Sequence, residues 1–296
     1  MVQHIVVTGG NSGIGLALCE QLAKRGCKVY LGSRDAAKGE AAVKAIKAAV
    51  PSAAVELLQI DVGSDASVAT AAAAIGSALG GEQLYAIVNN AGTGLAHGVD
   101  SQTMINTNFY GPKRVVAAFL PLLTSDGRIV NVGSGAGPSY IKKCTDRDVQ
   151  QTLCSAEATW EQIEQAVQRG LKCDGRQGYG CSKAGVGAYT MLLARSHPGL
   201  LISCVSRVAR VHRHGHREWV WRHQATGAGH SQHPPLPVRV ARGQRLVLRQ
   251  RRGEKPAPLL AQPGRARVRW RATGLLTGPW GKVRLGSSPY LIWRLA

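Results

Sequence analysis

The sequence predicts an α/β fold, a doubly wound parallel sheet of the Rossmann type, over its first two thirds. Short apolar runs alternate with stretches of helical periodicity up to about residue 205, which is typical of a parallel sheet with helices on both faces. A glycine-rich loop, TGGNSGIG at 8–15, stands between the first apolar run and the first helical stretch. Because about 200 residues suffice for one domain with a substantial core, we expect a single domain over 1–205.

The expected elements follow in order along the chain. Apolar runs predict strands at 4–8, 28–31, 55–60, 84–88, 128–133 and 200–205. Helical stretches predict helices at 14–25, 36–49, 66–79, 101–123 and 179–195. Pro51 and the Gly80-Gly81 pair are expected to end the second and third helices. Residues 135–178 read as a polar insertion, in which Trp160, Ile163 and Val167 recur at the spacing of a short amphipathic helix.

The glycine loop has a composition suited to a nucleotide phosphate. Its glycines Gly9, Gly13 and Gly15 form G-x-x-x-G-x-G rather than the usual G-x-G-x-x-G. Such a loop lets the backbone approach a pyrophosphate, and the N-terminus of the following helix favours negative charge. A plain glycine turn is the alternative interpretation.

Tyr179 and Lys183 give the strongest chemical signal. They stand four residues apart, about one helical turn, and therefore share a helix face. A nearby ammonium stabilises a phenolate, which makes a phenol a better proton donor. The same spacing also occurs in solvated helices, but two further motifs precede it: NNAG at 89–92 and RIVNVGS at 128–134.

These four motifs, in this order, resemble the short-chain dehydrogenase/reductase family over residues 1 to about 205. The long segment between Ser134 and Tyr179 is similar to that of the carbonyl-reductase-like subgroup. The resemblance implies hydride transfer from a nicotinamide cofactor to a ketone or aldehyde carbonyl, with the protein supplying position, a proton and oxyanion stabilisation.

The resemblance also implies the roles of single residues. Tyr179 corresponds to the general acid, and Lys183 to the lysine that assists it and binds the nicotinamide ribose. Ser134 corresponds to the hydrogen-bond donor for the substrate carbonyl, although Gly133 stands where many members carry a first serine. Asn108 corresponds to the asparagine that holds a relay water, whereas the nearby Asn106 is expected to be a helix-surface residue.

The end of the second predicted strand favours NADPH over NAD. Gly32 and Ser33 occupy the place where NAD-preferring sites commonly have a carboxylate, and Arg34, suited to a 2′-phosphate, follows them. The adjacent Asp35 leaves NAD open, and a solvated loop charge is the other interpretation of Arg34. By resemblance, Asp61 and Val62 contact the adenine. The expected cofactor residues are Gly9, Asn11, Ser12, Gly13, Ile14, Gly15, Arg34, Asp61, Val62, Asn90, Ala91, Gly92, Tyr179 and Lys183.

Cysteine usage and the N-terminus indicate a reduced, cytoplasmic protein. Seven cysteines occur without a secretory signal, and the spacings of Cys144, Cys154 and Cys173 fit no zinc motif, so we expect no metal. The chain enters its first strand without a visible signal or transit peptide, and no apolar run is long enough to span a membrane. In the resembling subgroup such an insertion covers the surface that other members use to dimerise, which implies a monomer.

The composition changes abruptly after residue 206. Residues 1–206 carry 18 Lys and Arg against 15 Asp and Glu, whereas 207–296 carry 19 against 2, and 17 of those 19 cations are arginine. Nearly all of the net charge of +20 therefore lies in 206–296, a basic segment without sustained periodicity. Such a composition predicts low order, so the C-terminal part of the fold is expected to be missing or disordered.

Back-translation gives this basic segment a second interpretation. Read one base later, the codons for 207–215 can spell Val-Ser-Pro-Gly-Phe-Ile-Asp-Thr-Ala, and the resembling family has a Pro-Gly turn at this point. In the same frame 219–224 can give Gly-Tyr-Gly-Ala-Thr-Lys, and 247–256 can give Tyr-Tyr-Gly-Ser-Asp-Gly-Glu-Lys-Ser-Pro. Residues after about 204 are thus expected to be a frameshifted translation, caused by about seven extra bases that begin GTNAGY, like a splice donor.

Three functions follow from these observations. The first is NADPH-dependent reduction of a small carbonyl compound, for which the sequence specifies neither the substrate nor the physiological direction. The second is an NADP-binding protein impaired in catalysis, because the substrate loop and the last strand are lost. The third is nucleic-acid binding by the basic segment, whose Trp219, Trp221 and Trp270 are interleaved with arginines.

Overall fold

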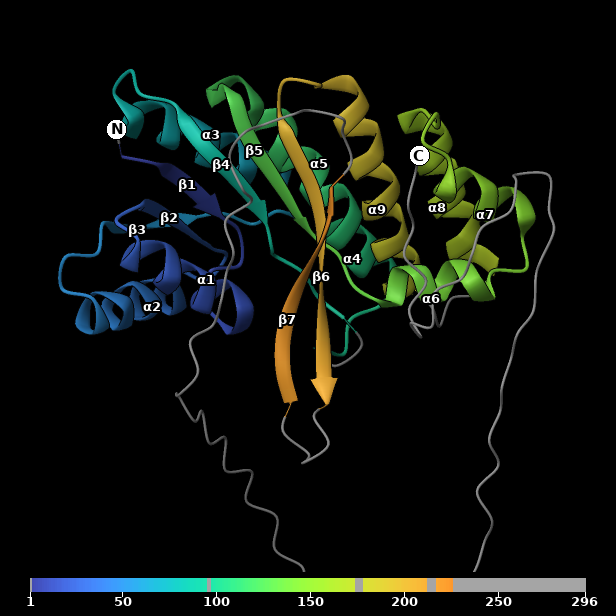
Figure 1. The fold of residues 1–296 in the computed structure, drawn as a ribbon, viewed down its shortest axis with the longest axis horizontal. Helices are drawn as coiled ribbons and strands as arrows, with labels where there is room; N and C mark the ends of the chain where they lie inside the picture. The colour runs from blue at the N-terminus through green and yellow to red at the C-terminus, as the bar shows by residue number, and fades with distance from the viewer. Residues whose placement is uncertain (1, 95–96, 174–177, 212–216, 226–296) are drawn as a thin grey trace, which may run out of the picture. The chain divides into compact units, whose positions relative to one another are not determined.

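The computed structural model describes residues 2–94, 97–173, 178–211 and 217–225. Seven strands form one sheet in the order β3-β2-β1-β4-β5-β6-β7 (Figure 1). Neighbouring strands from β3 to β6 pair in parallel. Their bounds are β1 (His4–Val7), β2 (Lys28–Ser33), β3 (Val55–Gln59), β4 (Leu84–Asn89), β5 (Leu123–Val132) and β6 (Leu201–Val211), followed by β7 (Arg217–Ala225). The predicted doubly wound parallel sheet is confirmed.

Helices cover both faces of the sheet because the strands alternate their apolar side chains. Ile5 and Val7 of β1 pack with α1 and α2 in one cluster, whereas Val6 between them packs with α3, α5 and α9 in the other. The principal helices are α1 (Gly13–Lys24), α2 (Ala36–Ala49), α3 (Asp65–Leu79), α5 (Gly111–Phe119) and α9 (Gly178–Ser196). No described helix has the length and apolarity needed to cross a bilayer.

The helix predicted at 101–123 is in fact broken into four pieces. These are α4 (Ser101–Ile105), a π-helical turn η2 (Asn106–Tyr110), α5, and a 3-10 turn η3 (Leu120–Leu122). The π-turn arises where the Asn108 side chain leaves the helix to bond the backbone of Thr93, and such turns recur at functional sites. β5 then begins at Leu123, five residues earlier than predicted, because Leu123 already pairs with Leu84.

The insertion at 135–178 contains three helices where the sequence predicted one. The predicted helix is α8 (Trp160–Cys173), and α6 (Ala136–Lys143) and α7 (Arg147–Cys154) precede it. Trp160 stacks on Phe109 with ring centres 5.0 Å apart and meets Tyr189 edge-on at 5.4 Å. Since Phe109 and Tyr189 lie on η2 and α9, the insertion covers the outer face of these two elements.

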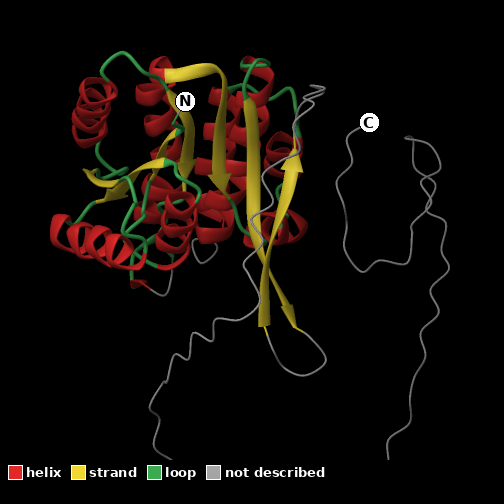
Figure 2. Cartoon of the chain, turned by 60° about the vertical axis from the view of Figure 1, so that its left-hand side comes forward, coloured by secondary structure: helices red, strands yellow, loops and turns green. Residues whose placement is uncertain are grey.

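The sheet does not end at β6. β7 pairs antiparallel with β6 from Ser203↔Ala225 to Val211↔Arg217, so residues 217–225, which fall in the segment expected to have low order, form the edge strand of this sheet. Beyond Val205, β6 has left β5 and pairs with β7 alone, and Figure 2 shows both strands running past the ends of their neighbours. Residues 226–296, with Trp270, lie outside the described part of the chain.

Candidate active site

The predicted site residues gather at the carboxyl ends of the parallel strands. The glycine loop follows β1, the NNAG segment follows β4, and Ser134 follows β5. β1 and β4 are neighbours, whereas the chain proceeds outward from β1 through β2 to β3 before it returns to β4. Strand order therefore reverses between β1 and β4, which is where open α/β sheets bind ligands.

The glycine loop depends on backbone conformations and close contacts that require glycine. Gly9 and Gly13 have φ of +65° and +55°, a region that favours glycine. A Cβ on Gly15 would overlap the Gly9 carbonyl and the Asn90 amide. Ser12 precedes α1 without making a side-chain cap, so the first amides of α1 are left to an anion, whose charge the helix N-terminus favours.

Thr8 and Asn90 brace this loop against the end of β4. The Asn90 side-chain amide donates to the carbonyls of Thr8 and Gly9 at 2.9 and 3.0 Å. The Thr8 hydroxyl in turn accepts from the amides of Asn90 and Ala91 at 3.1 and 3.0 Å. The Asn90 side chain, predicted to bind cofactor, thus holds the loop that would bind it.

Two charged residues, Arg34 and Asp35, follow the end of β2. The Asp35 carboxylate accepts from the Lys38 amide at 3.0 Å and caps α2, and this backbone hydrogen bond holds the pKa of Asp35 below its usual value. Arg34 is exposed at the end of β2. Asp35 is thus a helix cap, and the side chains of Arg34 and Asp35 are both exposed at this end of the sheet.

Asp61 and Val62 form the turn between β3 and α3. The Asp61 carboxylate accepts from the Gly63 amide at 2.9 Å, and the Asp61 amide donates to the Ser67 hydroxyl at 2.9 Å. The Val62 side chain is buried in the core. Only the backbone of Val62 therefore remains for the adenine contact that the sequence predicted.

Asn108 is buried, and its side chain makes three hydrogen bonds. Its side chain accepts from the Thr93 amide at 2.8 Å and donates to the Thr93 carbonyl at 2.8 Å and the Ser182 hydroxyl at 3.1 Å. A Cβ on Gly92 would lie 3.2 Å from Asn108 Oδ1 and 3.6 Å from Lys183 Nζ. The fold thus brings Asn108 and Lys183 together around the backbone of Gly92.

Lys183 and Tyr179 share the face of α9 that lies toward this point. Lys183 is 8% exposed, and its Nζ donates to the Val132 carbonyl at 2.8 Å and lies 6.0 Å from the centre of the Tyr179 ring. Burial lowers the pKa of Lys183 to about 8, partly offset by the neighbouring Cys204. The Tyr179 ring borders Gly94, whose added Cβ would lie 3.3 Å away.

Ser134 lies on the turn between β5 and α6. Its hydroxyl oxygen accepts from the Ala136 amide at 3.2 Å, which leaves the hydroxyl hydrogen for a substrate oxygen. The turn leads into α6, where a Cβ on Gly137 would lie 3.0 Å from the Lys183 backbone. The start of α6 therefore packs closely against α9. At Gly133, the Cys204 sulfur lies 2.7 Å from the position of an added Cβ, which explains why a first serine does not fit there.

Sequence reasoning missed the residues that hold these groups in place. Ser182 donates to the Tyr179 carbonyl at 2.8 Å while it accepts from Asn108, and its position directly before Lys183 is a signal that could have identified it. Asn106 was expected on the helix surface, but it is half-buried and bonds the Gly63 carbonyl at 3.1 Å. Two surface grooves border Arg114, and neither is lined by Tyr179 or Lys183.

Within the described residues no group of His, Cys, Asp and Glu could hold a metal ion. Among the side chains that the structure describes, six cysteines are free thiols: Cys19, Cys27, Cys144, Cys154, Cys181 and Cys204. Burial raises the pKa of Cys19 to about 12 and of Cys181 to about 11. These two thiols therefore remain protonated at neutral pH and act as packing groups.

Comparison with known proteins agrees with this geometry. The family model for short chain dehydrogenases matches residues 3–145. Short-chain dehydrogenase/reductase 1 of Saponaria officinalis is 33% identical over 69% of this chain and 80% of its own. Carbonyl reductase [NADPH] 1 of Bos taurus is 30% identical, over 64% of this chain and 73% of its own. The structure of menthone neomenthol reductase from Mentha piperita is 29% identical, with a TM-score of 0.62 over 69% of this chain and 89% of its own.

Proposed function

Because the chain belongs to the short-chain dehydrogenase/reductase family, we propose that it reduces a ketone or aldehyde with NADPH. The observation that carries the proposal is the convergence of Asn108, Tyr179 and Lys183 around Gly92 and Gly94. A carbonyl-reductase-type oxidoreductase fits the relatives, among them carbonyl reductase [NADPH] 1 of Bos taurus and (+)-neomenthol dehydrogenase of Arabidopsis thaliana. A small carbonyl compound is the proposed substrate.

In the proposed reaction each of these residues has a separate role. The bound cofactor would supply the hydride, held by the glycine loop and the N-terminus of α1. Tyr179 donates a proton to the carbonyl oxygen as negative charge develops there, and the free Ser134 hydroxyl donates a hydrogen bond to the same oxygen. The Lys183 ammonium binds the nicotinamide ribose and favours the phenolate that Tyr179 becomes. Asn108 and Ser182 fix the relative positions of the NNAG loop and α9.

Arg34 is expected to select the phosphorylated cofactor. In Arg34→Ala, kcat/KM with NADPH should fall about tenfold or more, because a charged hydrogen bond of roughly 1.5–3 kcal/mol is lost, while kcat/KM with NADH should change little. The measurement is initial-rate oxidation of both cofactors with a panel of monoterpenoid ketones and aromatic aldehydes. Lys47→Ala, which removes an exposed cation from the last turn of α2, is the charge-matched control. Preference of the unaltered protein for NADH would contradict the NADPH assignment, and reduction of no carbonyl compound would contradict the activity.

The buried Lys183 predicts opposite pH trends for activity and stability. Its pKa of about 8 lies below the ordinary 10.5, so the ammonium is lost above pH 8 in the folded protein, and kcat/KM for reduction should decline there. The unfolded chain binds this proton up to about pH 10.5, so the Lys183 contribution to the free energy of unfolding should rise from pH 8 to 10.5. Urea unfolding of the unaltered protein and of Lys183→Met across pH 7–10 measures this contribution. Equal pH slopes for the two proteins would contradict it.

A second candidate function is cofactor binding without turnover. Beyond Val205, β6 continues into the antiparallel hairpin with β7, where the resembling family places its Pro-Gly turn and substrate loop. Binding of NADPH without reduction of any carbonyl compound would favour this candidate. The nucleic-acid interpretation depends on side chains after Ser206, which lie outside the described part of the chain.

The insertion supports a monomer as the proposed oligomeric state. Trp160 stacks on Phe109, the Gln168 amide donates to the Tyr110 hydroxyl at 2.9 Å, and Ile163 and Val167 are fully buried. These contacts cover η2 and α9, and in the resembling subgroup such an insertion covers the surface that other members use to dimerise. The cytoplasm remains the proposed location.

A further inference from the structure

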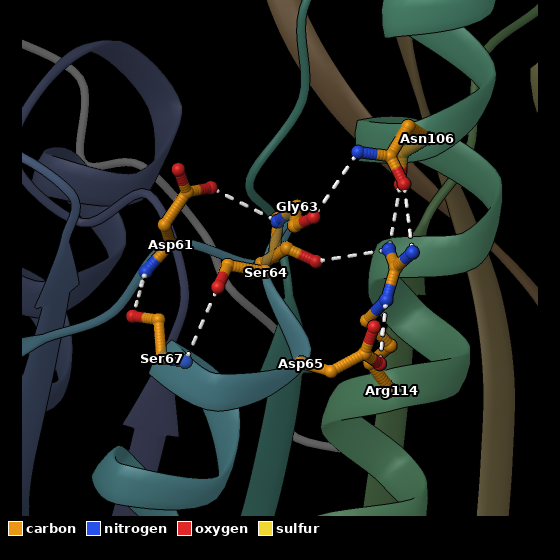
Figure 3. A network of polar contacts seen from close by, with 8 residues as sticks. Asp61, Gly63, Ser64, Asp65, Ser67, Asn106 and Arg114 are labelled. Atoms are coloured by element: carbon orange, nitrogen blue, oxygen red, sulfur yellow. Dashed lines mark hydrogen bonds and ion pairs between the residues drawn. The ribbon is translucent and has the colours of Figure 1, made fainter.

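Arg114 of α5 lies at the centre of a polar network that the proposed mechanism does not use (Figure 3). Its Nε donates to Asp65 at 2.9 Å, and its Nη2 donates to the Asn106 side chain at 2.7 Å. Its Nη1 donates to the carbonyls of Val62 and Asn106 at 3.3 and 3.2 Å. Four of the five N–H groups of the guanidinium are thus engaged, so Arg114 is a clamp between two backbone segments rather than a free anion site.

Asn106 completes the clamp from the other side. Its side-chain amide donates to the Gly63 carbonyl at 3.1 Å while its side-chain oxygen accepts from Arg114. The pair therefore holds both Val62 and Gly63, the centre of the turn between β3 and α3. Without the clamp, the turn would keep its local bonds, from Asp61 to Gly63 and Ser67 and from the Ser64 amide to the Asp61 carbonyl, but would lose its bonds to η2 and α5.

Asn106 of the clamp and Asn108 lie on the same π-helical turn. Asn106 and Asn108 are two residues apart, so their side chains leave the helix on nearly opposite sides. Asn106 bonds the turn after β3, and Asn108 bonds Thr93 after β4 and Ser182 of α9. One turn, η2, therefore links the segment proposed to contact adenine with the segments proposed to contact nicotinamide.

We propose that Arg114 and Asn106 are positioning residues for the adenine end of the cofactor, acting through the turn at Asp61, Val62 and Gly63. This inference rests on the proposed NADPH-dependent function. The ion pair with Asp65 contributes little, because the Asp65 side chain is 85% exposed and surface pairs are weak. The hydrogen bonds to the Val62 carbonyl and to Asn106 carry the effect.

The test measures binding of 2′,5′-ADP, a fragment with the adenine and the 2′-phosphate but no nicotinamide, to the full chain by calorimetry. Arg114→Met and Asn106→Ala are each expected to raise the Kd of 2′,5′-ADP about tenfold. Because both residues act on one turn, the double variant should raise this Kd by far less than the product of the two single fold-changes. Asp65→Asn should leave the Kd within about twofold. NADPH titrations should show KM rising with kcat unchanged.

Arg195 provides the matched control. It also clamps backbone, since it donates to the carbonyls of Ala156 and Ala158 and pairs with Glu157, but its partners lie in the insertion. Arg195→Met should leave the Kd of 2′,5′-ADP unchanged, even where it lowers thermal stability as much as Arg114→Met does. A merely structural role for Arg114 would instead make the two variants behave alike.

Hydrogen exchange separates failure of the inference from failure of the proposed function. In cofactor-free protein, Arg114→Met should speed exchange of the Gly63 and Ser67 amides more than Arg195→Met does. If Arg114→Met changes neither the exchange rates of these amides nor the Kd of 2′,5′-ADP, the inference about the clamp is wrong while the proposed function stands. Absence of 2′,5′-ADP binding by the unaltered chain would overturn the cofactor assignment, and with it the role of the clamp toward adenine.

Discussion

Replacing Tyr179 with phenylalanine is expected to lower kcat for carbonyl reduction by about 10²–10⁴-fold, the usual contribution of a general acid. The substitution removes one hydroxyl and keeps the ring that packs beside Gly94. Lys183 keeps its hydrogen bond to the Val132 carbonyl, and the glycine loop is untouched. NADPH affinity should therefore stay within about twofold. Single-turnover kinetics and a fluorescence titration of NADPH measure the two quantities separately.

Tyr189 offers a matched control on the same helix. It is buried and meets Trp160 of the insertion edge-on, away from Gly94, so Tyr189→Phe also removes a hydroxyl from α9 and should leave kcat nearly unchanged. Retention of turnover in Tyr179→Phe would contradict its assignment as the proton donor. Equal losses in the two variants would mean that damage to α9, rather than loss of a proton donor, explains the effect.

The strands and longer helices of this fold could be predicted from the sequence because each depends on local pattern. The prediction of a helix at 36–49 is confirmed at both ends, where Asp35 caps the start and Val50, before Pro51, ends it. Gly80 ends α3 as predicted, and it does so in the left-handed conformation that favours glycine. The predicted site residues also lie where the strand order requires, at the carboxyl ends of β1, β4 and β5.

The features that sequence could not supply depend on contacts between distant segments. The π-turn forms because Asn108 bonds the backbone of Thr93, fifteen residues away, and nothing in the local sequence marks that partner. Asn106 seemed a surface residue because its partners are distant in sequence: Arg114 stands two turns further along, and Gly63 is 43 residues away. The helices α6 and α7 have eight residues each, too short for periodicity to distinguish them from a polar loop.

The reading frame of the chain beyond β5 is expected to have a large effect on activity. We propose that residues after about 204 are an out-of-frame translation, and that the protein in its restored frame is an ordinary reductase with a Pro-Gly turn, a substrate loop and a last strand that finishes the sheet. The abrupt change in arginine content supports this. So does the parallel pairing of β6, which ends at Val205, where the sequence placed the break. The Saponaria officinalis relative aligns with 69% of this chain, about the same share as residues 1–205 make up.

Sequencing of the transcript across the codons for Ser203 to Gly215 is expected to show about seven bases removed. The restored protein should then reduce its ketone at least about 10²-fold faster than the chain as written, because a loop that closes over the reactants positions them and excludes water. Tyr179→Phe in the restored protein is the control, since it should abolish the gain. An unaltered transcript would contradict the proposal. In that case the antiparallel β6–β7 hairpin closes the sheet of the natural protein, and a turnover of about 1 s⁻¹ or more by the chain as written would show that reduction needs no Pro-Gly turn.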